Sequence, residues 1–429
     1  MTRLVVVGGG VAGLAAARAG ARAGWRVTLL EASQRLGGKV LTEEVDGVPW
    51  EWGPDAIAAT KPRGEDLLEE LGLLEDALPP ATGRAYLLVG GELRPIPPGL
   101  TMGFPKGPGA LMEAARSGIV TRAEALRGAM EGAMPGRPRG SIAEVARARL
   151  GRGVAEKLTL PLVSAVFGTA DQDLEAAIPE MAGARSVTAG AARRPPVRFL
   201  GLRGGMGRLA EALVEKGVEV RTGARAEAIE GSAGAYVVRA DGAGVEADAV
   251  VVAVPAPSAR PLLPSLPEGL GAYTSSAVIH LRYPEGALGR PLDAAGYVAA
   301  DPGVVQACSW VSSKWPHLEE PGPHLRAVVV EPAIDDDEAL ALAVVEEVGR
   351  VMEAGADPDV VRVRPWALAL PRYLPGHVET VRRIREALPP SIQLAGASFD
   401  GVGVPDCVAS GEEAFRRIAA LWETTPDAG

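Results

Sequence analysis

Dense apolar runs and helical apolar stripes alternate at the start of the chain, and each predicts a different element. Arg3–Val7 is a short, almost wholly apolar run that is typical of a buried parallel strand. The alanine-rich stretch Ala12–Ala23 predicts a helix that ends at Gly24. Arg26–Leu30 predicts a second strand. The chain therefore opens as a strand–helix–strand unit.

The next segment is rich in helical patterns and punctuated by prolines. The leucines of Glu65–Leu78 recur at the spacing of one helical face. Ser141 and Glu144 have the spacing of a capping box ahead of a helix over Val145–Leu150, which Gly151 can close. This segment is therefore predicted to be mostly helical.

The α/β pattern returns in the second half of the chain. Met206–Lys216 predicts a helix, whereas Val218–Val220, Tyr236–Arg239 and Ala249–Val254 predict strands. A longer helix over about 336–354 carries aspartates near its start, where the helix dipole favours negative charge.

The tail, 385–422, contains a strand, a glycine-rich turn and a helix. It repeats the type of elements seen at the start of the chain. We therefore predict that one α/β unit is assembled from three separated pieces of sequence, with other segments inserted between them.

Composition and charge restrict the class of protein. A chain of 429 residues suggests two or three structural units, and 47% apolar with 23% charged residues is typical of a globular protein. The net charge of −10 and the lack of a basic stripe argue against a nucleic-acid partner. The N-terminus shows no secretory signal, and no apolar run approaches the ~18 residues of a membrane span.

The cysteines and histidines do not have the spacing of a metal site or of a disulfide framework. Cys308 and Cys407 lie far apart in the sequence, so one disulfide is possible, although a reduced cytoplasmic chain is favoured. The two cysteines and four histidines lack zinc-ligand spacing, and we expect no metal.

A glycine motif lies between the first strand and the first helix, where a dinucleotide-binding turn requires it. The first glycine allows a tight turn, the second lets the backbone approach a pyrophosphate, and the third lets helix and strand pack closely. Glu31 ends the second strand, where its carboxylate can accept from ribose hydroxyls. The motif alone leaves NAD and FAD open. Its residues are Gly8, Gly9, Gly10, Val11, Ala12 and Gly13.

The segment after the second strand favours FAD. It resembles the E-x-x-x-R-x-G-G segment of the FAD-containing amine-oxidase superfamily, in which a glycine loop closes over the pyrophosphate. The stretch from Glu51 to Asp55 resembles that superfamily's segment passing the flavin. The predicted cofactor residues in these two stretches are Glu31, Ala32, Arg35, Gly38, Lys39, Gly53, Pro54, Asp55 and Ala56.

Four further stretches carry a narrower resemblance: 84–91, 201–206, 371–377 and 394–407. With them, the chain resembles the porphyrinogen oxidases of haem biosynthesis over roughly residues 3–418. The resemblance implies a Rossmann-like FAD-binding fold of the amine-oxidase/p-hydroxybenzoate hydroxylase type, with an inserted α+β substrate domain and a helical domain. The implied boundaries are 1–63, 200–265 and 385–423 for FAD binding, 64–172 for a helical domain of the membrane-contacting type, and 173–199 with 266–384 for substrate binding.

The resemblance also implies roles for single residues. Val402, Gly403 and Val404 would lie at the isoalloxazine ring, and Ala226 would contact the adenine side through its backbone. A helix starting at Pro405 would point its positive end at the flavin pyrimidine, where reduction places negative charge.

The implied reaction is a six-electron oxidation of a porphyrinogen, by hydride transfer to FAD three times over, with O₂ reduced to peroxide. No nucleophile–base motif is evident, so the cofactor carries the chemistry and we name no catalytic residue. Arg84 matches a position that anchors a substrate propionate, and Tyr373 and His377 would line the cavity. Arg203, Lys314 and Arg372 are weaker candidates for the anionic groups.

The stretch 308–317 resembles the coproporphyrinogen-oxidising branch, which favours coproporphyrinogen III over protoporphyrinogen IX as substrate. Weak peripheral membrane contact is compatible with this branch, and the oligomeric state is not indicated. The helical insertion is compact for the family, and only 4% of residues are aromatic. The alternatives are another flavin oxidase, such as an amine oxidase or carotenoid desaturase, and a non-catalytic flavin- or tetrapyrrole-binding protein.

Overall fold

The computed structural model describes residues 1–101, 103–133, 140–167, 174 and 198–423. The chain divides into two compact units. Unit 1 consists of 1–79, 196–272 and 377–429, and unit 2 consists of 80–195 and 273–376. The three-domain boundaries expected from the sequence stay a prediction.

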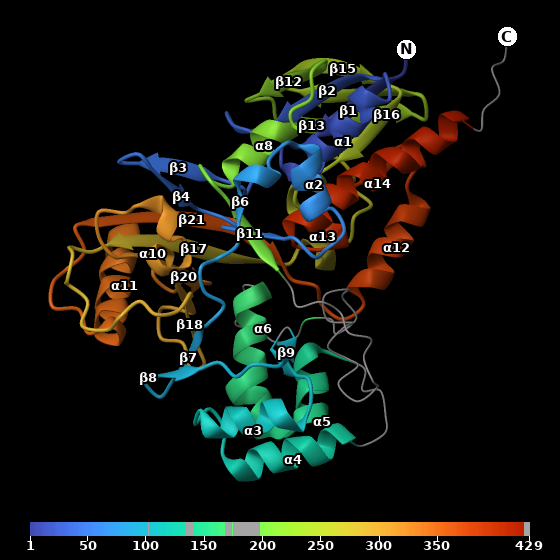
Figure 1. The fold of residues 1–429 in the computed structure, drawn as a ribbon. Helices are drawn as coiled ribbons and strands as arrows, with labels where there is room; N and C mark the ends of the chain where they lie inside the picture. Colours follow the sequence, from blue (N-terminus) through green and yellow to red (C-terminus); the bar gives the residue numbers. More distant parts are fainter. Residues whose placement is uncertain (102, 134–139, 168–173, 175–197, 424–429) are drawn as a thin grey trace. The chain divides into compact units, whose positions relative to one another are not determined.

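A parallel five-stranded sheet forms the centre of unit 1 (Figure 1). The strands predicted at both ends of the chain and in its middle come together in this sheet, which confirms that the α/β unit is built from separated pieces. In spatial order the strands are β12 (Val218–Thr222), β2 (Arg26–Glu31), β1 (Arg3–Val7), β16 (Ala249–Val252) and β22 (Ile392–Leu394).

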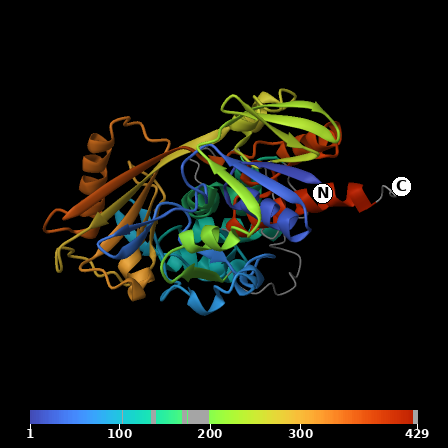
Figure 2. The same cartoon turned by 90° about the horizontal axis from the view of Figure 1, so that it is seen from above.

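The two faces of this sheet are covered differently, because successive side chains of a strand point to opposite sides. Leu4 and Val6 of β1 pack with helices, whereas Val5 and Val7 pack with a three-stranded antiparallel sheet. Figure 2 shows this yellow-green sheet as a layer beside the blue strands. The helices are α1 (Val11–Arg22), α8 (Gly207–Leu213) and α14 (Val404–Glu423), and the sheet consists of β13 (Ala226–Ser232), β14 (Ala235–Ala240) and β15 (Ala243–Ala247).

Helices α1 and α14 pack side by side although they come from opposite ends of the sequence (Figure 1). A β-carbon at Gly411 would lie 2.0 Å from the Ala12 carbonyl oxygen, so glycine is required for this approach. Further along, Trp25 packs against Phe415 and Trp422. Residues later in α1 and just after it contact residues later in α14, so the two helices run in the same direction.

The rest of unit 1 consists of short elements. They are β3 (Thr42–Val45), β4 (Val48–Glu51), β5 (Ile57–Ala58), α2 (Glu65–Glu70), β6 (Ala77–Leu78), β11 (Phe199–Leu202), α9 (Ala256–Ala259), α12 (His377–Ala387) and α13 (Ala397–Asp400), with 3₁₀ turns at Leu74–Asp76 and Glu268–Gly271.

Unit 2 is built on a seven-stranded mixed sheet (Figure 1). The family-like stretch 84–91 contains the first strand and the turn of a hairpin, and this first strand pairs with β18 in parallel. The strands in spatial order are β21 (Val360–Pro371), β17 (Tyr273–Arg282), β20 (His324–Val330), β19 (Ala307–Trp310), β18 (Gly296–Ala299), β7 (Tyr86–Val89) and β8 (Glu92–Pro95).

Helices complete unit 2. The long helix α11 (Asp337–Met352) packs on one sheet face, and the predicted aspartate near its start, Asp336, caps it by accepting from Ala339 N. The other elements are β9 (Leu100–Thr101), β10 (Phe104–Pro105), α3 (Pro108–Arg116), α4 (Arg122–Ala133), α5 (Ile142–Val154), a π-helical turn (Ala155–Thr159), α6 (Leu160–Phe167), α10 (Val311–Lys314) and a 3₁₀ turn (Pro316–Leu318).

Two local predictions in the proline-rich segment had different outcomes. The capping box of Ser141 and Glu144 is confirmed, since both of its hydrogen bonds are present. The single helix over Glu65–Leu78 is wrong: α2 ends at Glu70 because Gly72 takes a left-handed φ of 69°, and a 3₁₀ turn and a short strand follow. Gly151 does leave helical geometry, but the helix resumes after this kink.

In the described part of the chain, no helix has the length and apolar character needed to cross a bilayer. Cys308 and Cys407 are both buried and free. The pKa of each thiol is raised to about 12, chiefly because burial disfavours the thiolate. Neither thiol is therefore a nucleophile at neutral pH.

Candidate functional site: a dinucleotide cradle

The glycine motif forms the turn between β1 and α1, and each glycine has a separate steric reason. Gly8 has a φ of 107°, which disfavours other residues. A β-carbon at Gly13 would lie 1.8 Å from the Gly8 carbonyl oxygen, so helix and turn touch there. A β-carbon at Gly10 would meet no atom within 4 Å. The structure therefore leaves open space beside Gly10, at the N-cap of α1.

The N-terminus of α1 suits an anion. Gly10 provides no side-chain cap, and the first turn contains no acidic residue. The first N–H groups of a helix lack intrahelical partners and lie at the positive end of its dipole. Backbone donors, positive potential and open space thus coincide, which is the arrangement that a pyrophosphate requires.

Glu31 holds the turn in shape. Its carboxylate accepts from Gly9 N and from Ser33 N, each at 2.7 Å. An ionised carboxylate has about four acceptor positions, so these two bonds leave capacity for ribose hydroxyls. Glu31 therefore supports the glycine turn and also fits the ribose role predicted for it.

The loop after Glu31 closes onto the glycine turn. Gly37 N donates to the Gly9 carbonyl oxygen at 2.8 Å. A β-carbon at Gly38 would lie 3.1 Å from the Gly10 Cα, so the two glycine segments are in near contact. Arg35 donates to the carbonyl oxygen of Gly38 at 2.6 Å, which places its guanidinium within this loop. Ala32 is exposed at the loop's start.

The segment that passes Lys39 makes another close backbone contact. A β-carbon at Gly53 would lie 1.8 Å from the Lys39 carbonyl oxygen, so only glycine fits there. Burial lowers the pKa of the Lys39 ammonium, and the nearby Cys407 opposes this shift. The predicted residues that follow Gly53 are half-buried between β4 and β5: Pro54, Asp55 and Ala56.

The segment that leads into Ala226, the residue predicted for the adenine side, lies beside the end of β2. Gly223 N donates to the Ser33 carbonyl oxygen and Ala224 N donates to the Glu31 carbonyl oxygen, each at 2.8 Å. β13 then begins at Ala226. This second chain segment is therefore fixed next to the carboxylate predicted to contact the ribose.

The last of the three sequence pieces of unit 1 forms a glycine turn at the start of α14. Gly401 has a φ of 126°. Gly403 N donates to Asp406 at 3.1 Å, and its carbonyl oxygen accepts from Cys407 N at 2.9 Å. Val402 and Gly403 are half-buried, whereas Val404 is buried as the first residue of α14. Because α1 and α14 point the same way and Gly411 lies against Ala12, this turn lies beyond the N-terminus of α1.

The predicted substrate residues are in different settings. Arg84 in unit 2 has a side chain that is 66% exposed and is 3.1 Å from Asp293. The Tyr86 hydroxyl donates to the same carboxylate at 3.0 Å. Burial and Asp293 together raise the pKa of Tyr86. Arg84 is thus a surface arginine with a protein partner.

Tyr373 and His377 fall in different units. Tyr373 is buried in unit 2, and His377 is buried at the start of α12 in unit 1. Burial lowers the pKa of His377 to about 4, although Asp400 opposes the shift. His377 is therefore a neutral imidazole at neutral pH.

Of the weaker candidates, Arg203 is exposed and its carbonyl oxygen accepts from Arg208, whereas Lys314 lies 5.3 Å from the Trp315 ring centre. Arg372 follows β21 and is half-buried.

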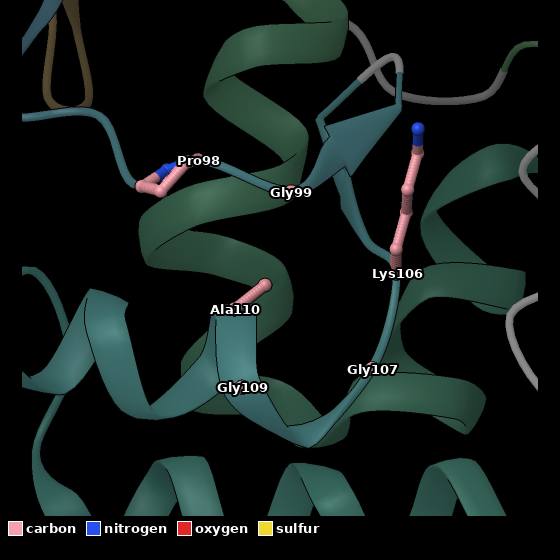
Figure 3. A pocket seen from close by; sticks show the side chains of 6 residues that line it. All are labelled: Pro98, Gly99, Lys106, Gly107, Gly109 and Ala110. Atoms are coloured by element: carbon pink, nitrogen blue, oxygen red, sulfur yellow. The ribbon is translucent and has the colours of Figure 1, made fainter. Parts of the chain in front are cut away.

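Figure 3 shows a cavity in unit 2 that none of these residues lines. It has a volume of about 360 Å³ between the β9 loop and α3. The side chain of Lys106 points away from the other labelled residues. Its lining contains none of the predicted substrate residues: Pro98, Gly99, Lys106, Gly107, Gly109 and Ala110.

Comparison with known proteins agrees with this geometry. The family model for flavin-containing amine oxidoreductases matches residues 11–419. A coproporphyrinogen III oxidase from Bacillus subtilis is 30% identical, over 96% of both chains. The chain belongs to the porphyrinogen oxidase family of flavin-containing amine oxidoreductases.

Two further proteins are similar to this chain over nearly its whole length. The human protoporphyrinogen oxidase is also 30% identical, over 96% of this chain and 97% of the human one. A solved structure from Exiguobacterium sp. 255-15, which carries a provisional protoporphyrinogen oxidase name, superposes with a TM-score of 0.84. It is 32% identical and covers 98% of this chain and 99% of that one.

Membership in the porphyrinogen oxidase family confirms the predicted FAD-binding α/β fold and the assignment as an FAD-dependent oxidase. FAD is the cofactor, which decides between the two dinucleotides that the glycine motif left open. The segments 8–13, 31–39, 53–56, 223–226 and 401–404 together form the cradle for this cofactor. The cradle fits FAD because there is open space at Gly10 and because the N-terminus of α1 has no side-chain cap.

The sequence did not single out Lys61, and Asp406 was included only as part of the family-like stretch 394–407. The structure joins their side chains at 2.6 Å beside the Gly403 turn. The family-like stretch 394–407 gave a signal for Asp406. Lys61 had none, because its partner is far away in the sequence.

Proposed function

We propose that this oxidase converts coproporphyrinogen III to coproporphyrin III in haem biosynthesis. The observation that carries the proposal is the nearly full-length similarity to the Bacillus subtilis coproporphyrinogen III oxidase. The reaction removes six electrons and six protons from the substrate and passes them to three O₂ molecules, which become three H₂O₂. Bound FAD supplies the two-electron acceptor that links these transfers.

The chain's own residues bind and orient the cofactor in this proposal. The N-terminus of α1 holds the pyrophosphate, and Glu31 accepts from the ribose while it fixes Gly9. The segment at Ala226 supports the adenine side. Val402, Gly403 and Val404 border the flavin ring system, where the positive end of α14 favours added negative charge.

Arg84, Tyr373 and His377 are the proposed substrate contacts. Arg84 would bind a propionate, and its guanidinium has more donors than the one used toward Asp293. Neutral His377 would offer a hydrogen bond rather than a charge. We propose the cytoplasm as the location, with weak peripheral membrane contact compatible with it.

Protoporphyrinogen IX is the second candidate substrate. The human protoporphyrinogen oxidase shares the same 30% identity with this chain as the Bacillus subtilis relative. The stretch from Cys308 to His317 favours coproporphyrinogen III, because it resembles that branch.

A turnover assay tests the proposal. Purified FAD-loaded protein would be mixed in air with coproporphyrinogen III or, in parallel, with protoporphyrinogen IX. We expect porphyrin fluorescence to appear faster with coproporphyrinogen III, with about three peroxides for each porphyrin formed, since each peroxide accounts for two of the six electrons. A preference for protoporphyrinogen IX would reassign the substrate. Bound flavin without any turnover would indicate a carrier or another flavin oxidase.

A further inference from the structure

Lys61 and Asp406 connect two of the chain segments that form the cradle. The Lys61 Nζ lies 2.6 Å from Asp406 Oδ2, and the two side chains are 29% and 20% exposed. Lys61 lies between β5 and α2, and Asp406 lies in the first turn of α14. A pair this sheltered is screened less by salt than one on the open surface.

Both charges lie at the Gly403 turn. Gly403 N donates to Asp406 Oδ2 at 3.1 Å, so the carboxylate fixes the backbone of the turn. A β-carbon at Gly403 would lie 2.6 Å from Asp406 Oδ2 and 3.5 Å from Lys61 Nζ. The Lys61 ammonium and the Asp406 carboxylate therefore both lie next to the backbone of Gly403.

The two charges have opposite electrostatic effects. A carboxylate in the first turn is favourable for the helix, but it opposes any other negative charge placed near the same N-terminus. Lys61 offsets that charge without disturbing the hydrogen bond to Gly403. The result is a turn held by a carboxylate that keeps the positive potential of α14.

We propose that Lys61 and Asp406 are positioning residues that fix the 402–404 turn as a neutral pair, so that this turn favours negative charge on the flavin ring system. This inference rests on the proposed placement of 402–404 at the ring. Hydride transfer to oxidised flavin adds one negative charge to the ring system. An unbalanced charge at the turn should therefore change the flavin's midpoint potential.

Opposite substitutions should move the potential in opposite directions. Lys61→Met keeps the length of the side chain and leaves Asp406 unbalanced, so the midpoint potential should fall. Asp406→Asn keeps an acceptor for Gly403 N and leaves Lys61 unbalanced, so the potential should rise. We expect each change to alter the equilibrium constant for two-electron reduction on the order of tenfold, which is about 30 mV.

The test is a redox titration of the purified FAD-loaded protein, followed by flavin absorbance. The double variant of Lys61→Met with Asp406→Asn should return close to the wild-type potential. Lys157→Met removes an ion pair with Glu124 at 2.8 Å in unit 2 and should leave the potential unchanged. Shifts of the same sign, or none beyond this control, would overturn the proposal.

Loss of FAD from a variant would not end the test. If Lys61→Met purifies without flavin, Asp406→Asn must still raise the potential and Lys61→Arg must leave it unchanged, or the proposal fails. Reduced FAD content with a wild-type potential would also overturn it, because that result fits a merely structural contact. Absence of porphyrinogen turnover would refute the proposed substrate but leave these potentials measurable.

Discussion

The cofactor cradle and the predicted substrate residues differ in what fixes them. In the cradle the constraint is backbone against backbone: β-carbons at Gly13 and Gly53 would each lie 1.8 Å from a carbonyl oxygen. Arg84 and His377 are instead fixed by distant side chains or by burial. The first kind of constraint admits one residue type, whereas the second admits several.

This difference explains why the cradle leaves a clearer pattern in the sequence than the predicted substrate residues do. A glycine that no other residue can replace leaves a pattern in the sequence at fixed spacing. An arginine that binds Asp293 and an arginine that binds a propionate look the same in a sequence. Substitutions in the two regions can test whether this contrast holds in solution.

Gly13→Ala should have the largest effect. The new β-carbon would lie 1.8 Å from the Gly8 carbonyl oxygen, so the turn or the helix must move. We expect a loss of more than about 3 kcal/mol in the free energy of unfolding, together with loss of FAD. Chemical denaturation and the flavin-to-protein absorbance ratio measure these effects.

The matched control for this variant is Gly269→Ala. A β-carbon there would meet no atom within 4 Å, and the residue lies in an exposed turn of the same unit. It should retain wild-type stability and flavin content. A Gly13→Ala protein as stable as this control would show that the backbone contact is not a real constraint.

His377 should make stability depend on pH. Its folded pKa of about 4 lies below the unfolded value of about 6.5, so the unfolded chain binds more protons between these values. Its contribution is therefore present above pH 6.5 and is lost as the pH falls toward 4, by on the order of 3 kcal/mol. Urea denaturation at pH 7 and pH 4.5 should give a smaller difference for His377→Gln than for the wild type.

The comparison between proteins is needed because other groups titrate in the same range. Burial also lowers the pKa of His324, so the wild-type slope contains both histidines. Equal slopes for wild type and His377→Gln would contradict a buried neutral imidazole at position 377. That result would leave His377 available as a charged substrate contact and would narrow the contrast between the regions.

Gly10→Ala should separate cofactor binding from folding. The added methyl group meets no protein atom within 4 Å, and Gly10 has an ordinary φ of −70°. We therefore expect apoprotein stability within about 0.5 kcal/mol of wild type. The methyl would occupy space proposed for the pyrophosphate, so FAD should bind about tenfold more weakly, or about 1.4 kcal/mol. Fluorescence titration of apoprotein with FAD gives the Kd, and unchanged affinity would place the pyrophosphate elsewhere.

The sequence predicted the elements that local pattern determines. The strands of the central sheet, the Ser141 capping box and the glycine turn at Gly8 all depend on neighbouring residues, and the structure contains them. The predicted helix over Glu65–Leu78 failed because its leucine spacing was stronger than the signal from Gly72.

Contacts between segments that are distant in the sequence could not be predicted from local sequence patterns. No sequence pattern related Lys61 to Asp406 or Arg84 to Asp293, because no periodicity connects residues so far apart. The pairing of β7 with β18 was missed for the same reason. Family resemblance supplied the positions at Ala226 and Gly403, and backbone geometry then gave each a physical setting.

Arg84→Ala should have the smallest effect on the fold and tests the substrate region directly. Its ion pair with Asp293 is exposed, so removing it should change stability by less than about 1 kcal/mol. If Arg84 binds a propionate, KM should rise by an amount equivalent to about 1–3 kcal/mol, while flavin content stays unchanged. Arg116→Ala removes another exposed ion pair of unit 2 and should leave KM unaltered. Steady-state kinetics on coproporphyrinogen III decide the matter: equal KM values for the two variants would make Arg84 a surface residue only, because its charge would then serve Asp293 and not the substrate.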